Sequence, residues 1–313
     1  MNVGDMIVPS SDRSTWCGPE EVPGVLDLSR NTCYDRHLKN MISEWFKEMP
    51  GDSLFTYPDE RKLQQHICDR HQVDIDNIAI GLGSGEVLNR VIWLLRNRTL
   101  HVVSPTFQMV DILAKQYGCK MKHLNYTEFN KFNIDKIPKN SIVYIANPNG
   151  NNGHSFSIEQ IIHIHKNCEL LILDEAYVDF GGQAYSILSD SLIVLRTFSK
   201  SICLPGARCG YAVSTKNNIK ALQHCRPSIV TTTTACELIP KLIPEIENHV
   251  SRMKQCKQYL CSKFNHVNSD GNYVLVDTKH VENIQSFKYK EVDMYARFAL
   301  TDKHTMTRLV DEY

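Results

Sequence analysis

Two stretches of the chain, "LLILDEAYVDF" (170–180) and "LIVLRTFSK" (192–200), decide the fold and indicate where a site would lie. Each starts with apolar, β-favouring residues and ends on polar or charged ones. A strand that is apolar almost throughout is covered on both faces, as in a parallel sheet between helices. Ligands of such sheets bind beyond the carboxyl ends of the strands. We therefore predict two interior strands that are followed by residues with chemical roles.

The same pattern extends over residues 78 to 213, where short β-rich runs alternate with segments long enough for crossover helices. The other runs are "NIAIG" (77–81), "LHVVS" (100–104), "SIVYIA" (141–146) and "GYAV" (210–213). This alternation predicts an α/β fold with an open, mainly parallel, twisted sheet and helices on both faces.

The remainder of the chain predicts a second, smaller unit. "GNYVLVDT" (271–278) and "MYARFAL" (294–300) are typical of two strands in a small α+β domain. We expect an N-terminal arm with part of the small domain over 1–40, a large domain over 41–215 and the C-terminal small domain over 216–313.

The composition excludes several classes of protein. The 313 residues include 35 basic and 35 acidic side chains, so the formal net charge is zero and no general attraction to nucleic acid is expected. No apolar run approaches the roughly 20 residues that cross a bilayer. The first 24 residues have neither the basic start nor the apolar core of a secretory signal. We expect a cytoplasmic protein without a nucleic-acid or membrane partner.

The eleven cysteines are an odd number and are scattered along the chain without a CxxC pair. Complete pairing within the chain is therefore impossible, and the spacing shows no compact group of cysteines and histidines. We predict reduced, mostly buried thiols and no metal site.

A glycine-rich turn leads into a helix in "GLGSGEVLNRVIWLLR" (81–96). The backbone N–H groups of Ser84, Gly85 and Glu86 would lie at the start of that helix, where a phosphate can bind. A plain strand-to-helix turn fits the sequence equally well. The motif is not a dinucleotide fingerprint, because the third glycine of GxGxxG would fall at Glu86.

Polar or aromatic residues follow the next strands. Phe107 in "SPTFQMV" could stack on a planar ligand ring or could be a core side chain. Asn147 in "YIANPNGNNG" could be a ligand-binding amide or part of a turn. Asp174 would be buried, which requires a cationic partner, either a pyridinium nitrogen or an internal Lys or Arg. Tyr177 could reach the same ligand.

Lys200 follows the apolar run "LIVLRT" (192–197), and Ser199 and Arg208 supply hydrogen-bond donors suited to a phosphate. Each alternative is weak alone, but these groups occur in order, each after a strand. A planar, phosphorylated, pyridine-containing aldehyde would engage all of them, with the Lys200 amine bonded to it as an imine.

At this point the chain resembles the pyridoxal-phosphate-dependent aminotransferases of fold type I, which have the aspartate aminotransferase fold. The resemblance is to the histidinol-phosphate aminotransferase-like branch, which also contains threonine-phosphate decarboxylases. The motifs that carry it are "YPD" (57–59), "GSGE" (83–86), "NPN" (147–149), "DEAYVDF" (174–180) and "TFSK" with "ARCGY" (197–211).

The resemblance implies a role for each matching residue around the cofactor, pyridoxal 5'-phosphate. Lys200 would form the internal aldimine and move the substrate proton, and Asp174 would pair with the pyridine nitrogen. Tyr177 and Asn147 would hydrogen-bond the ring's 3-oxygen, and Phe107 would stack on the ring.

The resemblance also assigns the phosphate and the partner subunit. The backbone at Ser84, Gly85 and Glu86, with Ser199 and Arg208, would hold the cofactor phosphate. Tyr57 would reach the phosphate of the neighbouring subunit, which implies a homodimer.

For the substrate, the resemblance makes Arg297 the candidate for binding a carboxylate or phosphate, with Asn31 and Asn147 nearby. The alternative for Arg297 is a surface arginine on an edge strand. The sequence departs from the family pattern in "NPNGNNG", in the glycine of "GSGE" and in the 23 residues between Tyr273 and Arg297, which indicate a trimmed small domain.

The resulting prediction is an aminotransferase that moves an amino group between a small amino donor, plain or phosphorylated, and a 2-oxo acid. Two alternatives stay open. One is a pyridoxal-phosphate-dependent decarboxylase of an amino-acid phosphate, and the other is a homologue without catalytic activity.

Overall fold

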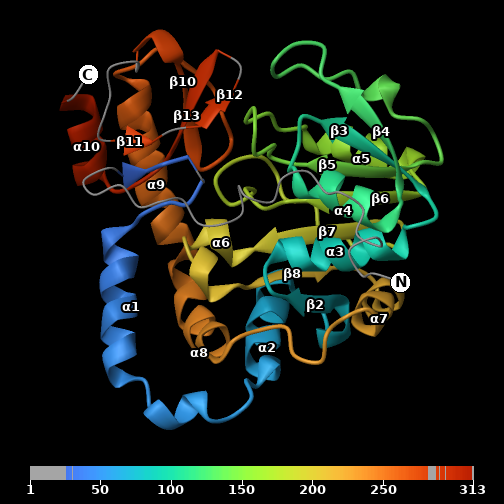
Figure 1. Cartoon of the computed structure of the whole chain (residues 1–313), viewed down its shortest axis with the longest axis horizontal. Coiled ribbons are helices and arrows are strands. Elements are labelled where there is room, and N and C mark those ends of the chain that lie inside the picture. Colours follow the sequence, from blue (N-terminus) through green and yellow to red (C-terminus); the bar gives the residue numbers. More distant parts are fainter. Residues whose placement is uncertain (1–25, 30, 281–286, 289, 293, 312–313) are drawn as a thin grey trace, which may run out of the picture.

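The computed structural model describes residues 26–29, 31–280, 287–288, 290–292 and 294–311. They form a large sheet with helices on both faces and a smaller sheet beside it, with the long helix α9 (Ile246–Cys261) next to the smaller sheet (Figure 1). The first 25 residues, including Cys17, lie outside the described part.

The large sheet has seven strands in the order β2-β8-β7-β6-β5-β3-β4. Its strands are β2 (Ile78–Gly81), β3 (Thr99–Ser104), β4 (Lys120–Asn125), β5 (Ile142–Ala146), β6 (Leu170–Asp174), β7 (Leu192–Thr197) and β8 (Gly210–Val213). Only β8 runs antiparallel to its neighbours, and the other pairs of adjacent strands are parallel. The predicted mainly parallel sheet is confirmed, as is each of its six predicted strands.

The strand β4 was not predicted from the sequence. Its residues, "KMKHLN", are mostly exposed because β4 lies at the edge of the sheet beside β3. An edge strand needs no continuous apolar run, since solvent reaches one side of it. The hydrophobic pattern therefore did not reveal it.

Alternating side chains of the strands divide the core into two layers. In β6, Leu171 and Leu173 face one layer, and Ile172 faces the other. In β5, Val143 belongs to the first layer and Tyr144 to the second. This period of two places apolar side chains on both faces, so helices must cover both.

Helices cover each face of the large sheet. One layer contains side chains of α3 (Ser84–Leu94), α4 (Met109–Tyr117) and α7 (Lys216–His224), and the other contains side chains of α1 (Arg36–Glu48), α2 (Glu60–His71), α5 (Ile158–Asn167), α8 (Thr233–Leu242) and α9. Cap residues fix several of the starts. Asp35 accepts hydrogen bonds at the start of α1, and Ser157 and Gln160 form a capping box on α5.

The smaller sheet has the order β12-β13-β10-β9. It contains β9 (His266–Val267), β10 (Tyr273–Asp277), β12 (Lys290–Val292) and β13 (Tyr295–Ala299), and α10 (Lys303–Asp311) follows it. The strands predicted at β10 and β13 are confirmed. Because β13 lies between β12 and β10, Arg297 is on an interior strand, and the alternative of an edge strand is wrong.

The start of the described chain runs along this smaller sheet. The strand β1 (Leu26–Asp27) pairs with β11 (Phe287–Lys288), and the backbone of Leu28 accepts a hydrogen bond from Ala299. The residues that follow β1 therefore lie between the smaller sheet and the large one. Among the described residues, no helix combines the length and apolar character needed to span a membrane.

Candidate active site

The carboxyl ends of β5, β6 and β7 bring three of the predicted residues to one edge of the large sheet. Ala146 is level with Asp174 in the parallel pair β5–β6, and the backbone N–H of Asn147 donates to the carbonyl of Asp174 at 2.8 Å. After β7, the short helix α6 (Phe198–Ser201) begins at once and carries Lys200. Residues that follow successive strands in the sequence therefore lie close together at one edge of the sheet, as expected for parallel strands.

Asp174 is buried, and its carboxylate has two hydrogen-bond donors. The Tyr144 hydroxyl donates to Oδ2 at 2.6 Å, and the backbone N–H of Ala176 donates to Oδ1 at 3.1 Å. Burial raises the pKa of Asp174, while these hydrogen bonds and the charge of Lys200 oppose the rise. Tyr144 was not predicted as a site residue, because its position in the run "SIVYIA" gave only a β-strand signal.

The neighbouring carboxylate, Glu175, has a different environment. It accepts hydrogen bonds from Arg196 Nε at 2.9 Å and from the backbone N–H of Tyr185 at 2.7 Å. Glu175 therefore has the internal cation that the sequence offered as one partner for a buried carboxylate. Among the described residues, Asp174 forms no ion pair with a Lys or Arg, although the charge of Lys200 acts on it.

Lys200 lies beside the turn that follows β1. The Thr197 hydroxyl accepts a hydrogen bond from the backbone N–H of Ser199 at 3.1 Å, which fixes the start of α6. Lys200 Nζ donates to the Asn31 carbonyl at 2.7 Å and lies 5.7 Å from the centre of the Tyr177 ring. The predicted residues Lys200, Asn31 and Tyr177 are therefore together.

Asn147 provides an independent indication of a ligand. Its Oδ1 accepts a hydrogen bond from the backbone N–H of Phe156 at 2.8 Å, which fixes the amide orientation. Its Nδ2 is buried and has no hydrogen-bond partner among the described residues. Buried donors are rarely left unsatisfied, so this one fits a ligand that supplies an acceptor. Together with the Asp174 carboxylate and the Lys200 amine, this donor fits a ligand whose pyridine ring bears an oxygen and an aldehyde.

The two predicted phosphate-binding segments also meet. Gly83 precedes α3 with a φ of +86°, and a Cβ there would lie 2.9 Å from Arg208 Nη2. Arg208 Nη2 donates to the Leu82 carbonyl at 2.9 Å. A Cβ on Gly85 would meet nothing within 4 Å, so the first turn of α3 is open at this residue.

Glu86 and Ser199 contribute to this region in different ways. The backbone N–H of Glu86 donates to the Gly83 carbonyl at 3.1 Å, and its carboxylate pairs with the buried Arg90. The backbone N–H and the carboxylate of Glu86 are therefore both engaged within the turn and the helix. Ser199 is half-buried on α6, next to Lys200.

Arg297 is buried and points from β13 toward the turn after β5. Its Nη1 donates to the Gly150 carbonyl at 2.6 Å and its Nη2 to the Ser29 carbonyl at 2.8 Å, and its buried Nε has no partner among the described residues. Asn31 Nδ2 donates to the same Gly150 carbonyl at 3.3 Å and to the Tyr177 hydroxyl at 3.1 Å. Asn31 therefore contacts Lys200 directly, and Arg297 is linked to Asn31 through the Gly150 carbonyl.

The departure "NPNGNNG" has a structural reason at Gly150. A Cβ there would lie 2.7 Å from Tyr177 Cε2, closer than real contacts allow. Gly150 lets the Tyr177 ring approach the turn, while its carbonyl accepts hydrogen bonds from Arg297 and Asn31.

Two predicted residues are exposed. The Phe107 side chain is 45% exposed, so the alternative of a core phenylalanine is wrong. Tyr57 is 85% exposed and lies between the 3-10 helix η3 (Gly51–Leu54) and α2. Leu54 and Phe55 beside it are also exposed, which makes an apolar surface segment over residues 54–57.

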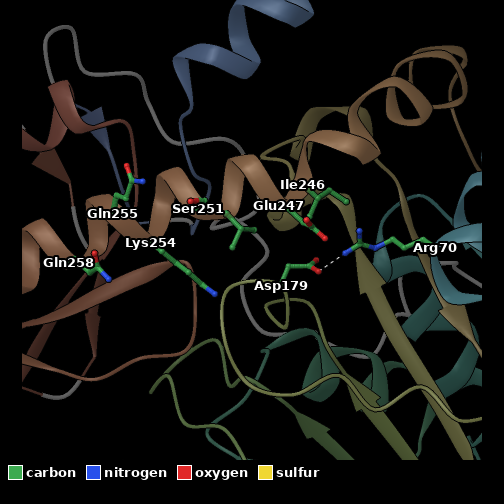
Figure 2. Close-up of a pocket in the computed structure, with 9 residues that line it drawn as sticks. Arg70, Asp179, Ile246, Glu247, Ser251, Lys254, Gln255 and Gln258 are labelled. Carbon is green, nitrogen blue, oxygen red and sulfur yellow. Dashed lines mark hydrogen bonds and ion pairs between the residues drawn. The ribbon is translucent and has the colours of Figure 1, made fainter.

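A separate hollow of about 460 Å³ lies along α9, away from the predicted residues. Figure 2 shows Arg70 and Asp179 pointing toward each other beside α9, and their side chains form an ion pair at 2.7 Å. The lining is Arg70, Asp179, Ile246, Glu247, Val250, Ser251, Lys254, Gln255 and Gln258. None of the predicted site residues lines this hollow, so the candidate site stays at the strand ends.

Comparison with known proteins shows the family to which this chain is similar. The family model "Aminotransferase class I and II" matches residues 23–312. A histidinol-phosphate aminotransferase of Thermotoga neapolitana is 31% identical over 255 residues, which cover 76% of this chain and 75% of that relative.

Two solved structures share the fold. One is histidinol-phosphate aminotransferase from Sinorhizobium meliloti in complex with pyridoxal-5'-phosphate, with a TM-score of 0.76, 18% identity and coverage of 91% of this chain and 89% of that one. The other is L-threonine-O-3-phosphate decarboxylase from Porphyromonas gingivalis, with a TM-score of 0.72, 16% identity and coverage of 92% and 98%.

Proposed function

We propose, from the premise that this chain belongs to the class I and II aminotransferases, that it moves an amino group between a small amino donor and a 2-oxo acid. Enzymes of this family use pyridoxal 5'-phosphate, which supplies an electron sink for the substrate α-carbon when bound. The observation that carries the proposal is the Lys200 amine near the buried Asp174, whose carboxylate forms no ion pair among the described residues.

Lys200 is the proposed catalytic base. An amine can take a proton from the substrate α-carbon only when it is neutral and held within reach. The Asn31 carbonyl, at 2.7 Å from Nζ, holds the amine at the sheet edge. Lys200 would bond the cofactor before the substrate arrives and would then carry the proton between two carbon atoms.

Asp174, Asn147 and Tyr177 are the proposed residues around the ring. Asp174 would face the ring nitrogen and keep a proton on it, because an ionised carboxylate favours a neighbouring cation. The unpaired Nδ2 of Asn147 and the Tyr177 hydroxyl would donate to the ring oxygen. Exposed Phe107 would complete the site by stacking on the ring.

The phosphate would bind at the start of α3. Ser84 and Gly85 lie there, a Cβ on Gly85 would meet nothing within 4 Å, and Arg208 packs on Gly83. Ser199 would add a hydroxyl. The macrodipole of α3 favours an anion at this end.

A homodimer is part of the proposal, because Tyr57 is 85% exposed and a second subunit could cover it. The apolar residues beside it would be covered by a second subunit, whose cofactor phosphate Tyr57 would reach. An exposed apolar segment of this kind is typical of an interface.

Arg297 is the proposed anchor for the substrate carboxylate or phosphate, with Asn31 and Asn147 beside it. Its unpartnered Nε and its position next to Gly150 support this role. We propose that the donor includes compounds with a phosphate, such as histidinol phosphate, the substrate in the name of the curated relative.

The test begins with an absorbance spectrum of the purified protein after incubation with pyridoxal phosphate. We expect a visible-edge band that changes on adding an amino donor and that is lost in Lys200→Ala. The matched control is Lys220→Ala, an exposed lysine on α7, which should keep the band. A wild-type spectrum that gains no band contradicts the proposal.

A second assay separates the two reactions of this branch. Histidinol phosphate, histidinol and threonine phosphate are each supplied as donors with 2-oxoglutarate. Formation of glutamate supports transamination, whereas carbon dioxide without glutamate shows decarboxylation and contradicts our assignment.

A further inference from the structure

Three side chains that are far apart in the sequence meet beneath the candidate active site. Cys33 follows the N-terminal strand, Cys203 follows α6, and His249 is on α9. Their sulfur and nitrogen atoms all lie within 4.8 Å of one another, and Cys203 Sγ is 3.4 Å from His249 Nε2. Cys33 and His249 are buried, and Cys203 is partly buried.

The other nitrogen of His249 is fixed by a carboxylate. His249 Nδ1 lies 2.8 Å from Asp35 Oδ2, and Arg252 Nη2 donates to the same oxygen at 2.8 Å. This contact directs Nε2 toward the two sulfur atoms. Histidines that bind metals usually donate their second N–H to a carboxylate in this way.

The spacing fits a tetrahedral ion. Zinc binds cysteine sulfur at about 2.3 Å and histidine nitrogen at about 2.0–2.1 Å, which implies a sulfur–nitrogen separation of about 3.6 Å. The observed 3.4 Å between Cys203 and His249 is close to this value. Asn272 Nδ2 also donates to Cys33 Sγ at 3.1 Å, a contact that suits a thiolate.

The backbone at Cys203 is a second, independent observation. Its φ of +55° lies in the left-handed region, which favours glycine. A cysteine at this position adopts an unfavourable backbone conformation while its sulfur reaches the cluster. Non-glycine residues in this conformation are enriched at functional sites.

We propose that Cys33, Cys203 and His249 bind one Zn²⁺ ion, with the fourth position open to water or another small ligand. Two thiolates and one imidazole are ligands that zinc prefers, and their combined charge balances the ion. Sequence spacing predicted no metal site, because each ligand comes from a different segment of the chain.

The ion would connect the segment after β1, the segment after α6 and helix α9. Hydrogen bonds would link this site to Lys200. Asn272 Nδ2 donates to both Cys33 Sγ and the Asn31 carbonyl, and that carbonyl accepts the hydrogen bond from Lys200. The inference does not depend on the proposed reaction, since it concerns metal binding alone.

The decisive variant is Cys203→Gly, because glycine accepts the backbone conformation and should leave the fold intact. Its control is Gln72→Gly, which changes a residue with a φ of +54° at the end of α2, outside the cluster. Each full-length, cofactor-loaded protein is purified without chelators, equilibrated with zinc, desalted and analysed for metal by mass spectrometry.

We expect about one zinc per chain in the wild type and in Gln72→Gly. In Cys203→Gly the bound zinc should fall at least about tenfold, because one of three protein ligands is lost. Titration against a chromogenic chelator should show the same order of affinities. Equal zinc content in the wild type and Cys203→Gly overturns the proposal.

Asp35→Asn tests the positioning of His249 and keeps a residue that can cap α1. We expect zinc affinity to fall about 10–100-fold, with α-helical circular dichroism unchanged. Unchanged affinity would contradict the role of Asp35. Peptide mapping of the wild type distinguishes a Cys33–Cys203 disulfide, and finding that disulfide in the zinc-equilibrated protein overturns the metal site.

Discussion

Asp174 and Glu175 are adjacent carboxylates, both buried, at the end of one strand, yet their surroundings differ. Glu175 is bonded by the Arg196 guanidinium and the Tyr185 backbone, so its charge is balanced within the chain. Asp174 has a hydroxyl and a backbone N–H but no cation at ion-pair distance among the described residues. Burial raises the pKa of both groups.

This difference distinguishes a buried carboxylate that stabilises the fold from one that is available to a ligand. A buried ion pair is complete without a ligand, whereas a buried carboxylate without an ion pair is stabilised by a cation from outside or takes up a proton. Within the described part of the chain, the buried Nδ2 of Asn147 likewise has no hydrogen-bond partner. Variants at the two carboxylates should therefore fail in different assays.

The largest expected effect is that of Asp174→Ala on catalysis. We expect kcat/KM to fall by about 10³-fold or more, because the ring nitrogen would lose its charged partner. Steady-state kinetics with saturating cofactor measures this change. Retention of more than a tenth of the wild-type value would show that Asp174 is not the functional member of the pair.

Glu175→Ala should instead destabilise the fold. Leaving the buried Arg196 without its partner is expected to lower the free energy of unfolding by about 3–5 kcal/mol. Denaturant titration of the cofactor-free protein gives this quantity. Glu169→Ala is the control, because Glu169 pairs with Arg98 at the surface and its loss should change stability by less than about 1 kcal/mol.

Tyr144→Phe tests the surroundings of Asp174 and has a smaller expected effect. The hydroxyl donates to Asp174 and lowers its pKa, so its removal should raise that pKa. The ionised form would then be lost at a higher pH, and the acid limb of the kcat/KM profile should move upward. Tyr117→Phe removes a hydroxyl that contacts Asn89 and should leave the profile unchanged.

The smallest expected effect concerns the exposed segment over residues 54–57. Tyr57→Phe should weaken pyridoxal-phosphate binding by about fivefold, which corresponds to one hydrogen bond of roughly 1 kcal/mol. Equilibrium titration of the cofactor-free protein measures the dissociation constant. An unchanged dissociation constant would contradict the contribution of Tyr57 from a second subunit.

Sequence patterns predicted six strands of the large sheet because interior parallel strands must be apolar on both faces. The polar edge strand β4 carries no such pattern and was missed. The sequence placed Asp174, Lys200 and Asn147 at strand ends, and the structure brings them to one edge.

Contacts between distant segments lay beyond the sequence patterns. The sequence could not show how the surroundings of Asp174 and Glu175 differ, because their partners Tyr144 and Arg196 come from other strands. The group of Cys33, Cys203 and His249 depends on three segments whose spacing follows no motif. Such contacts arise from packing, which a local pattern does not encode.

The reversed direction of β8 has a consequence for how the site can move. Arg208 comes before this strand, and because Thr197 pairs with Gly210 across the antiparallel pair, Arg208 reaches the same edge as Lys200. A short hairpin thus tethers the guanidinium to the amine, while Arg297 belongs to a separate sheet. A movement of that sheet against the large one would therefore change the distance from Arg297 to Lys200 and leave the distance from Arg208 to Lys200 unaltered.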